Sequence, residues 1–332
     1  MINTIYVENE IKDHSRTLSI LSKFKRSRII YIHKYSEIFN KKKQSFRLQK
    51  KDPLLILAKK NNNFVLKAPE GFGIGASKNY YFSHMYNCIY DCKYCFLQGL
   101  YSSANYLVFV NYEDFLNQIK NLVTRNKGKS ITFFSGYDCD SLAMEKVTSF
   151  ADFFLKNYLE NKKITYEFRT KSLQINPFLK NKPSENIIIA YSLLPGDLAQ
   201  KFDIKAPSIN LRIKSLKQLT SLGWKIGLRF DPLIYNNNWK ISYKELIRTI
   251  LDEINTNYLH SVSFGSLRFP KQIFNTINNM YPGDELFSHN FEKRDNVYSY
   301  KDEVEKEMIS YCKNLIYKKV KKDVQIFTCT PY

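Results

Sequence analysis

The chain has 332 residues, 44% of them hydrophobic, which is enough to bury a substantial core and excludes a largely disordered protein. Its 51 Lys and Arg residues against 31 Asp and Glu give a formal net charge of +20. A charge of this size favours contact with a polyanion such as nucleic acid, although nucleotide bias toward Lys, Asn and Ile also raises basicity.

Neither a leader nor a membrane segment is predicted. The first residues carry Glu8, Glu10 and Asp13, where a signal peptide needs a basic start and an apolar run. The apolar run at 54–57 is far shorter than the roughly 18 residues that span a bilayer. We therefore expect a cytoplasmic protein.

Residues 1–78 predict a basic N-terminal layer. Aromatic side chains alternate there with basic clusters around 23–28 and 41–51. Two interpretations stay open, a DNA-contact surface and a solvated basic face. The glycines at 71, 73 and 75 indicate a loop, because a dinucleotide fingerprint follows a strand and here the strand comes after.

Residues 79–282 alternate between short β-rich runs and longer helical runs. The expected strands cover residues 80–87, 130–136, 165–172, 186–193, 224–234 and 261–269. The expected helices cover residues 112–125, 142–161, 208–222, 242–255 and 270–281, with a short turn near 175–179. This order predicts an α/β fold, a parallel sheet forming a partial (β/α)6 TIM-like barrel. Residues 283–332 form a C-terminal extension, with a helix at 303–317 and a strand at 323–329.

Three cysteines lie just after the first expected barrel strand. Cys88, Cys92 and Cys95 form a C-x3-C-x2-C run, so their thiolates can face one point from a single loop. Iron–sulfur clusters usually take four cysteines, and a compact set of three leaves one iron of a [4Fe–4S] cluster open. The amino and carboxylate groups of S-adenosylmethionine fill such a site in radical enzymes, and Tyr94 suits stacking on its adenine.

A zinc site with His84 as the fourth ligand is the alternative. Structural zinc normally joins two ligand pairs separated by a longer loop, whereas these four residues lie within twelve positions. The cluster interpretation is therefore preferred. A zinc-stabilised nucleic-acid-binding module is disfavoured further by the six-strand pattern.

The stretch NCIYDCKYCFLQGLY at 87–101 resembles the spore photoproduct lyase family of radical S-adenosylmethionine enzymes. The resemblance continues through FFSGYDCDSL, FRTKSL, GWKIGLRFDPLI and SFGSLRFPK, and covers about residues 45 to 330. It implies a barrel of the radical S-adenosylmethionine type and cleavage of a methylene-bridged thymine dimer in DNA through a 5′-deoxyadenosyl radical. The implied partners are lesion-bearing DNA and an electron donor such as flavodoxin or ferredoxin.

The resemblance also implies roles for individual residues. Cys139 and Tyr94 are the expected catalytic residues, and Cys139 matches the cysteine that returns a hydrogen atom to the thymine radical. The residues expected to hold the cofactor are Tyr94, Ser135, Gly136, Ser141, Lys171 and Ser192. Arg229 and Asp231 end a strand at the expected chemical face or form a structural ion pair.

The sequence departs from the family pattern at three places. Phe96 stands where members often have a tyrosine thought to return the hydrogen to the cofactor, and Tyr137 stands where many have Glu. Arg294 and Tyr298 align only loosely with an Arg-Tyr pair on the substrate-side hairpin. Cys312 is expected to be a packed thiol. Cys329, at the end of the final strand, is expected to be packed as well, with an approach to the active site as the alternative. A radical enzyme that modifies RNA or a protein would share the same barrel and cluster motif.

Overall fold

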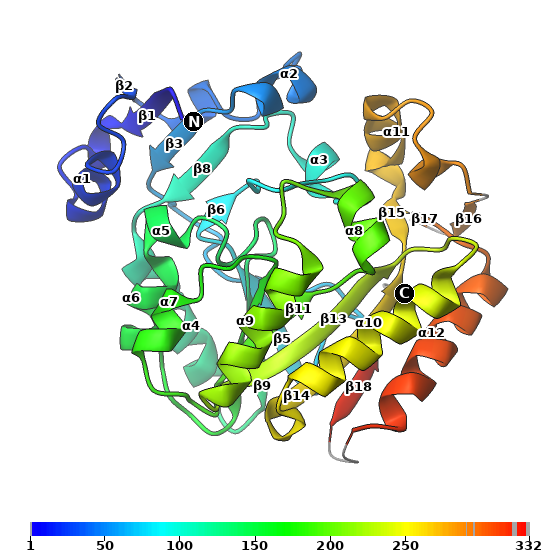
Figure 1. Cartoon of the computed structure of the whole chain (residues 1–332). Helices are drawn as coiled ribbons and strands as arrows, with labels where there is room; N and C mark the ends of the chain where they lie inside the picture. Colours follow the sequence, from blue (N-terminus) through cyan, green and yellow to red (C-terminus); the bar gives the residue numbers. More distant parts are fainter. Residues whose placement is uncertain (1, 290, 295, 321–323, 330–332) are drawn as a thin grey trace.

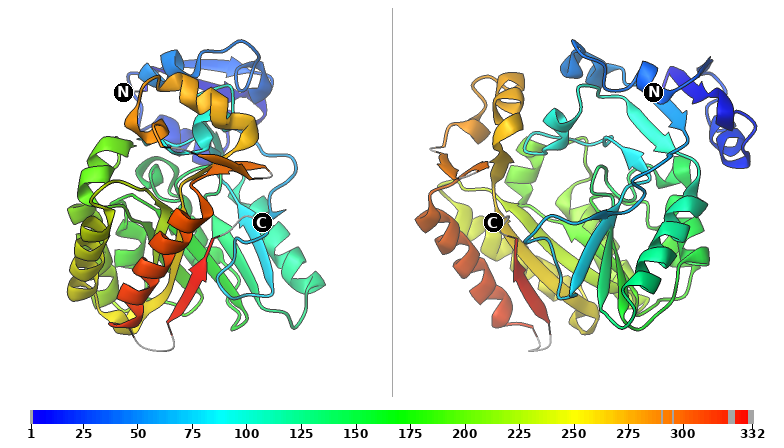
Figure 2. Two further views of the ribbon diagram at one scale, coloured as in Figure 1. Left: turned by 90° about the vertical axis from the view of Figure 1, so that its right-hand side faces the viewer. Right: turned by 180° about the vertical axis from the view of Figure 1, so that it is seen from behind.

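The computed structural model describes residues 2–289, 291–294, 296–320 and 324–329. Its main element is an eight-stranded sheet in the order β18-β14-β13-β11-β10-β9-β5-β4, curled into a partial barrel (Figures 1 and 2). Adjacent strands are parallel, except that β4 runs antiparallel to β5. The strands are β4 (Leu66–Lys67), β5 (Lys78–Phe82), β9 (Ile131–Ser135), β10 (Ile164–Thr170), β11 (Ile187–Ser192), β13 (Lys225–Leu233), β14 (Leu259–Ser266) and β18 (Gln325–Thr328).

Helices cover the outer face of this sheet, as the outer coils in Figure 1 show. The helices that accompany the strands are α4 (Tyr112–Arg125), α5 (Glu145–Thr148), α6 (Phe150–Asn157), α7 (Asn176–Lys180), α8 (Gly196–Phe202), α9 (Ile209–Ser221), α10 (Trp239–Glu253) and α12 (Asp302–Tyr317). Burial on both faces explains the nearly continuous apolar run of β11, where Ile187 to Tyr191 are fully buried. The predicted partial barrel is confirmed, because the six expected strands lie side by side in sequence order.

Several predicted elements differ in their limits. The expected strand at 261–269 is divided between β14 of the main sheet and β15 (Arg268–Pro270) of another sheet. The expected strand at 80–87 breaks at Ser83, and its end becomes β6 (Met85–Tyr86) of another sheet. The expected helix at 142–161 is divided at Ser149, whose φ of +50° is left-handed and ends α5 before α6 begins. The strand expected from 323, a position outside the described residues, joins the main sheet as β18.

The N-terminal layer is a second sheet in the order β2-β1-β3-β8-β6. It consists of β1 (Thr4–Glu8), β2 (Arg28–Ile32), β3 (Leu55–Ala58), β8 (Tyr106–Phe109) and β6, with helices α1 (Ser15–Leu21) and α2 (Phe46–Lys51). The sequence pattern missed β8, a run of only four residues that is buried throughout. Through β8 and β6, residues 1–78 share a sheet with the chain that carries the cysteines.

Small elements complete the mouth of the barrel. An antiparallel sheet in the order β15-β17-β16 and a two-stranded pairing of β7 with β12 lie there. These elements are β15 (Arg268–Pro270), β16 (Glu292–Arg294), β17 (Val297–Ser299), β7 (Asp91–Cys92), β12 (Asp203–Ile204), α3 (Leu97–Leu100) and α11 (Lys271–Met280). The 3-10 helices are η1 (Asn9–Ile11), η2 (Tyr35–Glu37), η3 (Thr256–Tyr258) and η4 (Glu285–Phe287). In the part of the chain that the structure describes, no helix is long and apolar enough to cross a bilayer.

Candidate active site

The three motif cysteines line one cavity of about 400 Å³ at the mouth of the barrel. Their loop is held at both sides. Lys50 of α2, itself buried, donates from Nζ to the carbonyl of Cys88 at 2.7 Å, and Arg47 pairs with Asp91 at 3.0 Å. On the other side, Cys92 pairs with Asp203 in the β7–β12 ladder. Part of the N-terminal basic cluster therefore supports the cysteine loop.

Burial disfavours the charged form of all three thiols. It raises the pKa of Cys88 to about 12, that of Cys92 well above its usual value, and that of Cys95 as well. Positive charge from iron would favour the thiolates, because metal binding and thiol deprotonation are coupled. Three thiols on one cavity wall fit a [4Fe–4S] cluster, in which each thiolate binds a different iron.

His84, the fourth ligand of the alternative zinc site, does not share the cavity that the three cysteines line. The His84 ring is buried and stacks on Phe150 with centroids 4.0 Å apart, and burial lowers its pKa to about 3. His84 packs in the core and does not line the cavity.

The loop after β9 forms a second wall of the cavity. Gly136 has a φ of +77°, and a Cβ there would lie 2.6 Å from Ser141 Oγ, so the turn requires glycine. Ser135 lines the cavity, and its buried hydroxyl has no hydrogen-bond partner in the structure. Ser141 does not line the cavity. Its hydroxyl donates to the carbonyl of Ser135 at 2.8 Å. Ser141 thus shapes the loop.

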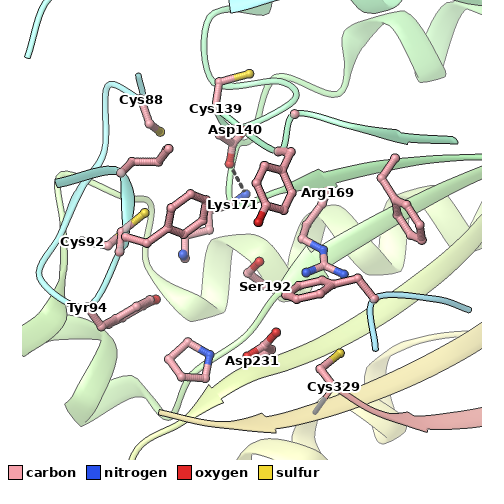
Figure 3. Close-up of a pocket in the computed structure, with 18 of the residues that line it drawn as sticks. Cys88, Cys92, Tyr94, Cys139, Asp140, Arg169, Lys171, Ser192, Asp231 and Cys329 are labelled. Atoms are coloured by element: carbon pink, nitrogen blue, oxygen red, sulfur yellow. Dashed lines mark hydrogen bonds between the residues drawn. The ribbon is translucent and has the colours of Figure 1, made fainter. Parts of the chain in front are cut away.

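Asp140, which the sequence analysis missed, fixes this loop to the end of β10. Its carboxylate accepts from Thr170 Oγ1 at 2.6 Å. It also accepts from the backbone N–H of Lys171 at 2.6 Å, the bond drawn as a dashed line in Figure 3. It also accepts from the N–H groups of Leu142 and Ala143. The signal in the sequence was an Asp directly before a Ser-Leu-Ala segment, a pattern in which carboxylates bond local backbone donors.

Cys139 lines the cavity that the three motif cysteines also line. Its side chain is buried, and burial raises the pKa of the thiol well above its usual value. The group is therefore a neutral S–H at neutral pH. In Figure 3, Cys139 and Cys88 lie at the same end of the site.

Lys171 and Tyr94 share a buried charge cluster with Asp203. The Lys171 ammonium lies 3.7 Å from Asp203 Oδ1, Arg212 pairs with Asp203 at 2.7 Å, and the Tyr94 hydroxyl donates to Asp203. Burial alone raises the pKa of Asp203, but the charges of Lys171 and Arg212 outweigh it and lower the pKa. Both Lys171 and Tyr94 line the cavity, as does Ser192, so all three are available to a ligand.

Arg229 and Asp231 do not pair with each other. Arg229 is fully buried and bonds Glu167 through two bonds of 2.7 and 3.1 Å, so it is a structural residue. Asp231 lines the cavity and pairs with Arg268 at 3.0 Å. Of these two residues, only Asp231 therefore lies at the active-site face expected for this strand end.

The remaining candidate residues differ in whether they line the cavity. Cys329, expected to be packed, lines the cavity, whereas Cys312 is fully buried in α12. Arg294 pairs with Asp302 and Glu305, and Tyr298 stacks on Phe274, so neither lines the cavity. Phe96 and Tyr137, two of the three departures from the family pattern, form an aromatic wall of the cavity, with ring centroids 5.4 Å apart.

The family assignment follows from comparison with known proteins. The model of the family described as spore photoproduct lyase matches residues 2–328. The chain belongs to the spore photoproduct lyase family.

Curated members of the family are distant in sequence. The spore photoproduct lyase of Clostridium acetobutylicum is 23% identical over 211 residues, which are 63% of this chain and 62% of that protein. The Bacillus subtilis enzyme is 20% identical over 202 residues, or 60% of this chain and 59% of that protein. The aligned segment thus spans about three fifths of the length of these relatives.

Solved structures of spore photoproduct lyase share the fold over the whole chain. One, in complex with dinucleoside spore photoproduct, superposes with a TM-score of 0.83 at 16% identity and covers 99% of each chain. Another, a mutant with bound AdoMet and dinucleoside spore photoproduct, has a TM-score of 0.83 at 17% identity and covers 100% of this chain and 98% of that one. The likeness establishes that this chain and those structures share one fold.

Proposed function

We propose that this protein repairs DNA by cleaving the methylene-bridged thymine dimer called spore photoproduct. Support comes from membership of the spore photoproduct lyase family and from the structure. The observation that carries the proposal is that Cys139 lines the same cavity as Cys88, Cys92 and Cys95. A protonated thiol and a cluster site facing one space fit a reaction that begins with radical formation and ends with hydrogen-atom return.

Cys88, Cys92 and Cys95 would hold the cluster, and the neighbouring polar groups would hold S-adenosylmethionine. When bound, a reduced cluster supplies the electron that splits S-adenosylmethionine into methionine and a 5′-deoxyadenosyl radical. Ser135 and Lys171 suit the amino and carboxylate groups of the methionine moiety, since one offers a free hydroxyl and the other an ammonium. Tyr94 and Ser192 complete the cofactor side of the cavity, and Gly136 and Ser141 keep the loop in shape.

Cys139 acts at the last step. Abstraction of hydrogen from C6 of the lesion is followed by scission of the bridge, which leaves one intact thymine and one thymine radical. The S–H bond of Cys139 then breaks, its hydrogen atom restores the second thymine, and a thiyl radical remains on sulfur. Burial keeps this thiol protonated before the transfer, as the step requires.

The proposed partners are DNA that carries the lesion and an electron donor such as flavodoxin or ferredoxin. All six cysteines are free in the structure. Free thiols and a cluster suit a reducing compartment, so we place the reaction in the cytoplasm. Entry of the lesion into the cavity requires that it be splayed out of the duplex stack.

The decisive test is anaerobic incubation of the reconstituted protein with S-adenosylmethionine, a reductant and ultraviolet-irradiated DNA. We expect restored thymine and consumption of spore photoproduct, measured by chromatography of the digested DNA. Formation of 5′-deoxyadenosine without any change in the lesion would favour the alternative, a radical enzyme that modifies RNA or a protein.

A further inference from the structure

One end of the cavity carries polar groups that the mechanism above does not use. Asp231 of β13, Arg268 of β15, and Ser263 and Ser266 of β14 line the cavity, and Arg268 bonds both Asp231 and the carbonyl of Ser266. In Figure 3, Asp231 lies on the side away from Cys88 and Cys139. This end is therefore separate from the cluster loop and open to a different part of a bound substrate.

The Asp231–Arg268 pair is built into this end with a fixed geometry. Arg268 donates from Nη1 to Asp231 Oδ1 at 3.0 Å and from Nη2 to Oδ2 at 3.3 Å, and Nη1 also donates to the carbonyl of Ser266 at 2.9 Å. A Cβ at Gly265 would lie 2.6 Å from Nη1 and 2.7 Å from Oδ1. The absence of a side chain at Gly265 thus leaves the room that the pair occupies.

The pair differs from a purely structural one in its access to the cavity. The side chains of Glu167 and Arg229, which pair deeper in the barrel, are 0% exposed. The side chains of Asp231 and Arg268 are 11% and 13% exposed, and both line the cavity. A carboxylate and a guanidinium held side by side offer an acceptor next to a donor.

Two serine hydroxyls extend this pattern. Ser263 and Ser266 are each 1% exposed, line the cavity, and have Oγ atoms without a hydrogen-bond partner in the structure. A buried hydroxyl left without a partner is unfavourable, so such groups are normally bonded to a ligand or to water. Ser266 lies beside the pair, because its carbonyl accepts from Arg268, and Ser263 lines the same cavity. Together these groups fit a ligand that offers several hydrogen-bonding groups.

We propose that these residues bind the imide edge of one thymine of the lesion, an inference that rests on the proposed function. The edge presents an N3–H donor between two carbonyl acceptors, O2 and O4. Asp231 accepts from N3–H, and Arg268 donates to one carbonyl. Ser263 and Ser266 bond the other carbonyl, so that the cavity recognises thymine by its pairing edge, as enzymes that read extruded bases do. Asp231 and Arg268 are then specificity-determining residues.

The test uses the substrate as well as the protein. Binding of dinucleoside spore photoproduct to the cluster-loaded, unreduced protein with S-adenosylmethionine is measured by anaerobic equilibrium dialysis. Two further ligands carry a methyl group at N3 of one thymine or of the other. One of these two isomers is expected to bind the wild-type protein about tenfold to a hundredfold more weakly, because a hydrogen bond to a charged group is lost.

The Asp231→Asn variant separates recognition from general damage. The variant is expected to bind the unmodified lesion about tenfold more weakly than the wild type does. Methylation at the same N3 is then expected to weaken binding to the variant by less than about threefold, because the hydrogen bond to Asp231 is already lost. Asp252→Asn is the matched control, since Asp252 pairs with Lys319 at 2.8 Å on the outside of the barrel, and it should bind all three ligands as the wild type does.

The outcomes distinguish this inference from the function on which it rests. If the wild-type protein binds and repairs the unmodified lesion but tolerates both N3-methylated isomers, the imide assignment is wrong while the function stands. Equal losses on methylation in the wild type and in Asp231→Asn would also overturn the role of Asp231. Failure of the wild-type protein to bind or repair the unmodified lesion would reject the proposed function itself.

Discussion

A residue that gives up a hydrogen atom must keep that hydrogen until the product radical forms. Burial raises the pKa of Cys139 well above its ordinary value, so the thiol remains protonated at neutral pH. Cys329 also faces the cavity, but it lies beside Asp231, on the side away from Cys139 (Figure 3). Position within the cavity therefore distinguishes two thiols that look alike in the sequence.

Cys139→Ala should leave the cluster, DNA binding and 5′-deoxyadenosine formation largely intact while repair fails at its final step. The amount of cofactor consumed per thymine restored should rise markedly, because the thymine radical is left to form adducts or revert. Chromatographic quantification of 5′-deoxyadenosine and thymine checks this ratio.

Two further thiols serve as comparisons for Cys139. Cys312→Ala removes a fully buried thiol of α12 and should change stability by about 1 kcal/mol without altering the ratio. A larger effect of Cys329→Ala than of Cys139→Ala would transfer the donor role to Cys329. If Cys139→Ala consumed the same amount of cofactor per thymine restored as the wild type does, Cys139 would not be the hydrogen donor.

Replacement of Cys88, Cys92 or Cys95 with Ala should abolish reductive cleavage of S-adenosylmethionine. Each thiolate is expected to bind a different iron, so no neighbouring thiol replaces the one that is lost. The wild-type protein, purified anaerobically, should hold about four irons and four sulfides, as the brown colour and metal analysis would show. Cleavage that survives in two of the three variants would contradict the ligand assignment.

At the scale of elements, the central strands are joined by a buried ion pair. Glu167 of β10 and Arg229 of β13 lie on opposite sides of β11, and both side chains are fully buried. A Cβ at Gly227 would lie 2.5 Å from Arg229 Nη2, so glycine at 227 makes room for the guanidinium. Burial alone raises the pKa of Glu167, but the charges of Arg229 and Arg169 together outweigh it and the pKa falls to about 2.

Glu167→Gln should destabilise the fold by about 3–5 kcal/mol at pH 7, because it leaves a buried guanidinium without its counter-charge. The folded pKa lies below the unfolded one, so the stabilisation is present above about pH 4.5 and is lost as the pH falls toward 2. The difference in unfolding free energy between wild type and variant should therefore shrink below about pH 4.5. Urea unfolding of the cluster-free proteins across this range measures it.

An exposed pair is the control for this prediction. Glu253 pairs with Lys217 at 2.7 Å on the surface, and Glu253→Gln should change the free energy of unfolding by no more than about 1 kcal/mol. If Glu167→Gln were no more costly than Glu253→Gln, the pair would not join β10 to β13 as described.

At the scale of the whole molecule, the net charge of +20 comes from basic residues of two kinds. Some make contacts inside the protein, and others are exposed on its surface. In the N-terminal layer, Lys50 and Arg47 hold the cysteine loop, whereas Lys41, Lys42 and Lys43 are exposed. Lys50 and Arg47 therefore fit neither a DNA-contact surface nor a solvated basic face, because they support the cysteine loop. The exposed lysines remain candidates for contact with phosphate.

Binding to duplex DNA should weaken linearly with salt on a double-logarithmic plot. The slope should be roughly 0.9 per phosphate neutralised, because each contact releases a condensed counterion. Fluorescence anisotropy at several salt concentrations checks this, with a Lys41, Lys42 and Lys43 triple Gln variant alongside. A smaller slope in that variant would place DNA on this face, and a flat response in the wild type would mean that the charge is compositional.

The sequence by itself determined the barrel and the cysteine loop. Six β-rich runs alternating with helices specify a parallel sheet, and three cysteines within eight positions specify a loop that offers three thiols. Both are local signals, because periodicity and short spacing are visible along the chain without knowledge of what lies beside it. The family resemblance added Cys139, whose place on the cavity wall the structure shows.

Only the tertiary structure decided which distant residues meet. Arg229 and Asp231 are two positions apart, yet one pairs with Glu167 inside the barrel and the other with Arg268 at the cavity, since the strand register shifts between Phe230 and Leu233. The partners of Lys171, the position of Cys329 and the four-residue strand β8 were invisible for the same reason. Strand register and packing between distant segments set these contacts, and neither leaves a periodic mark in the sequence.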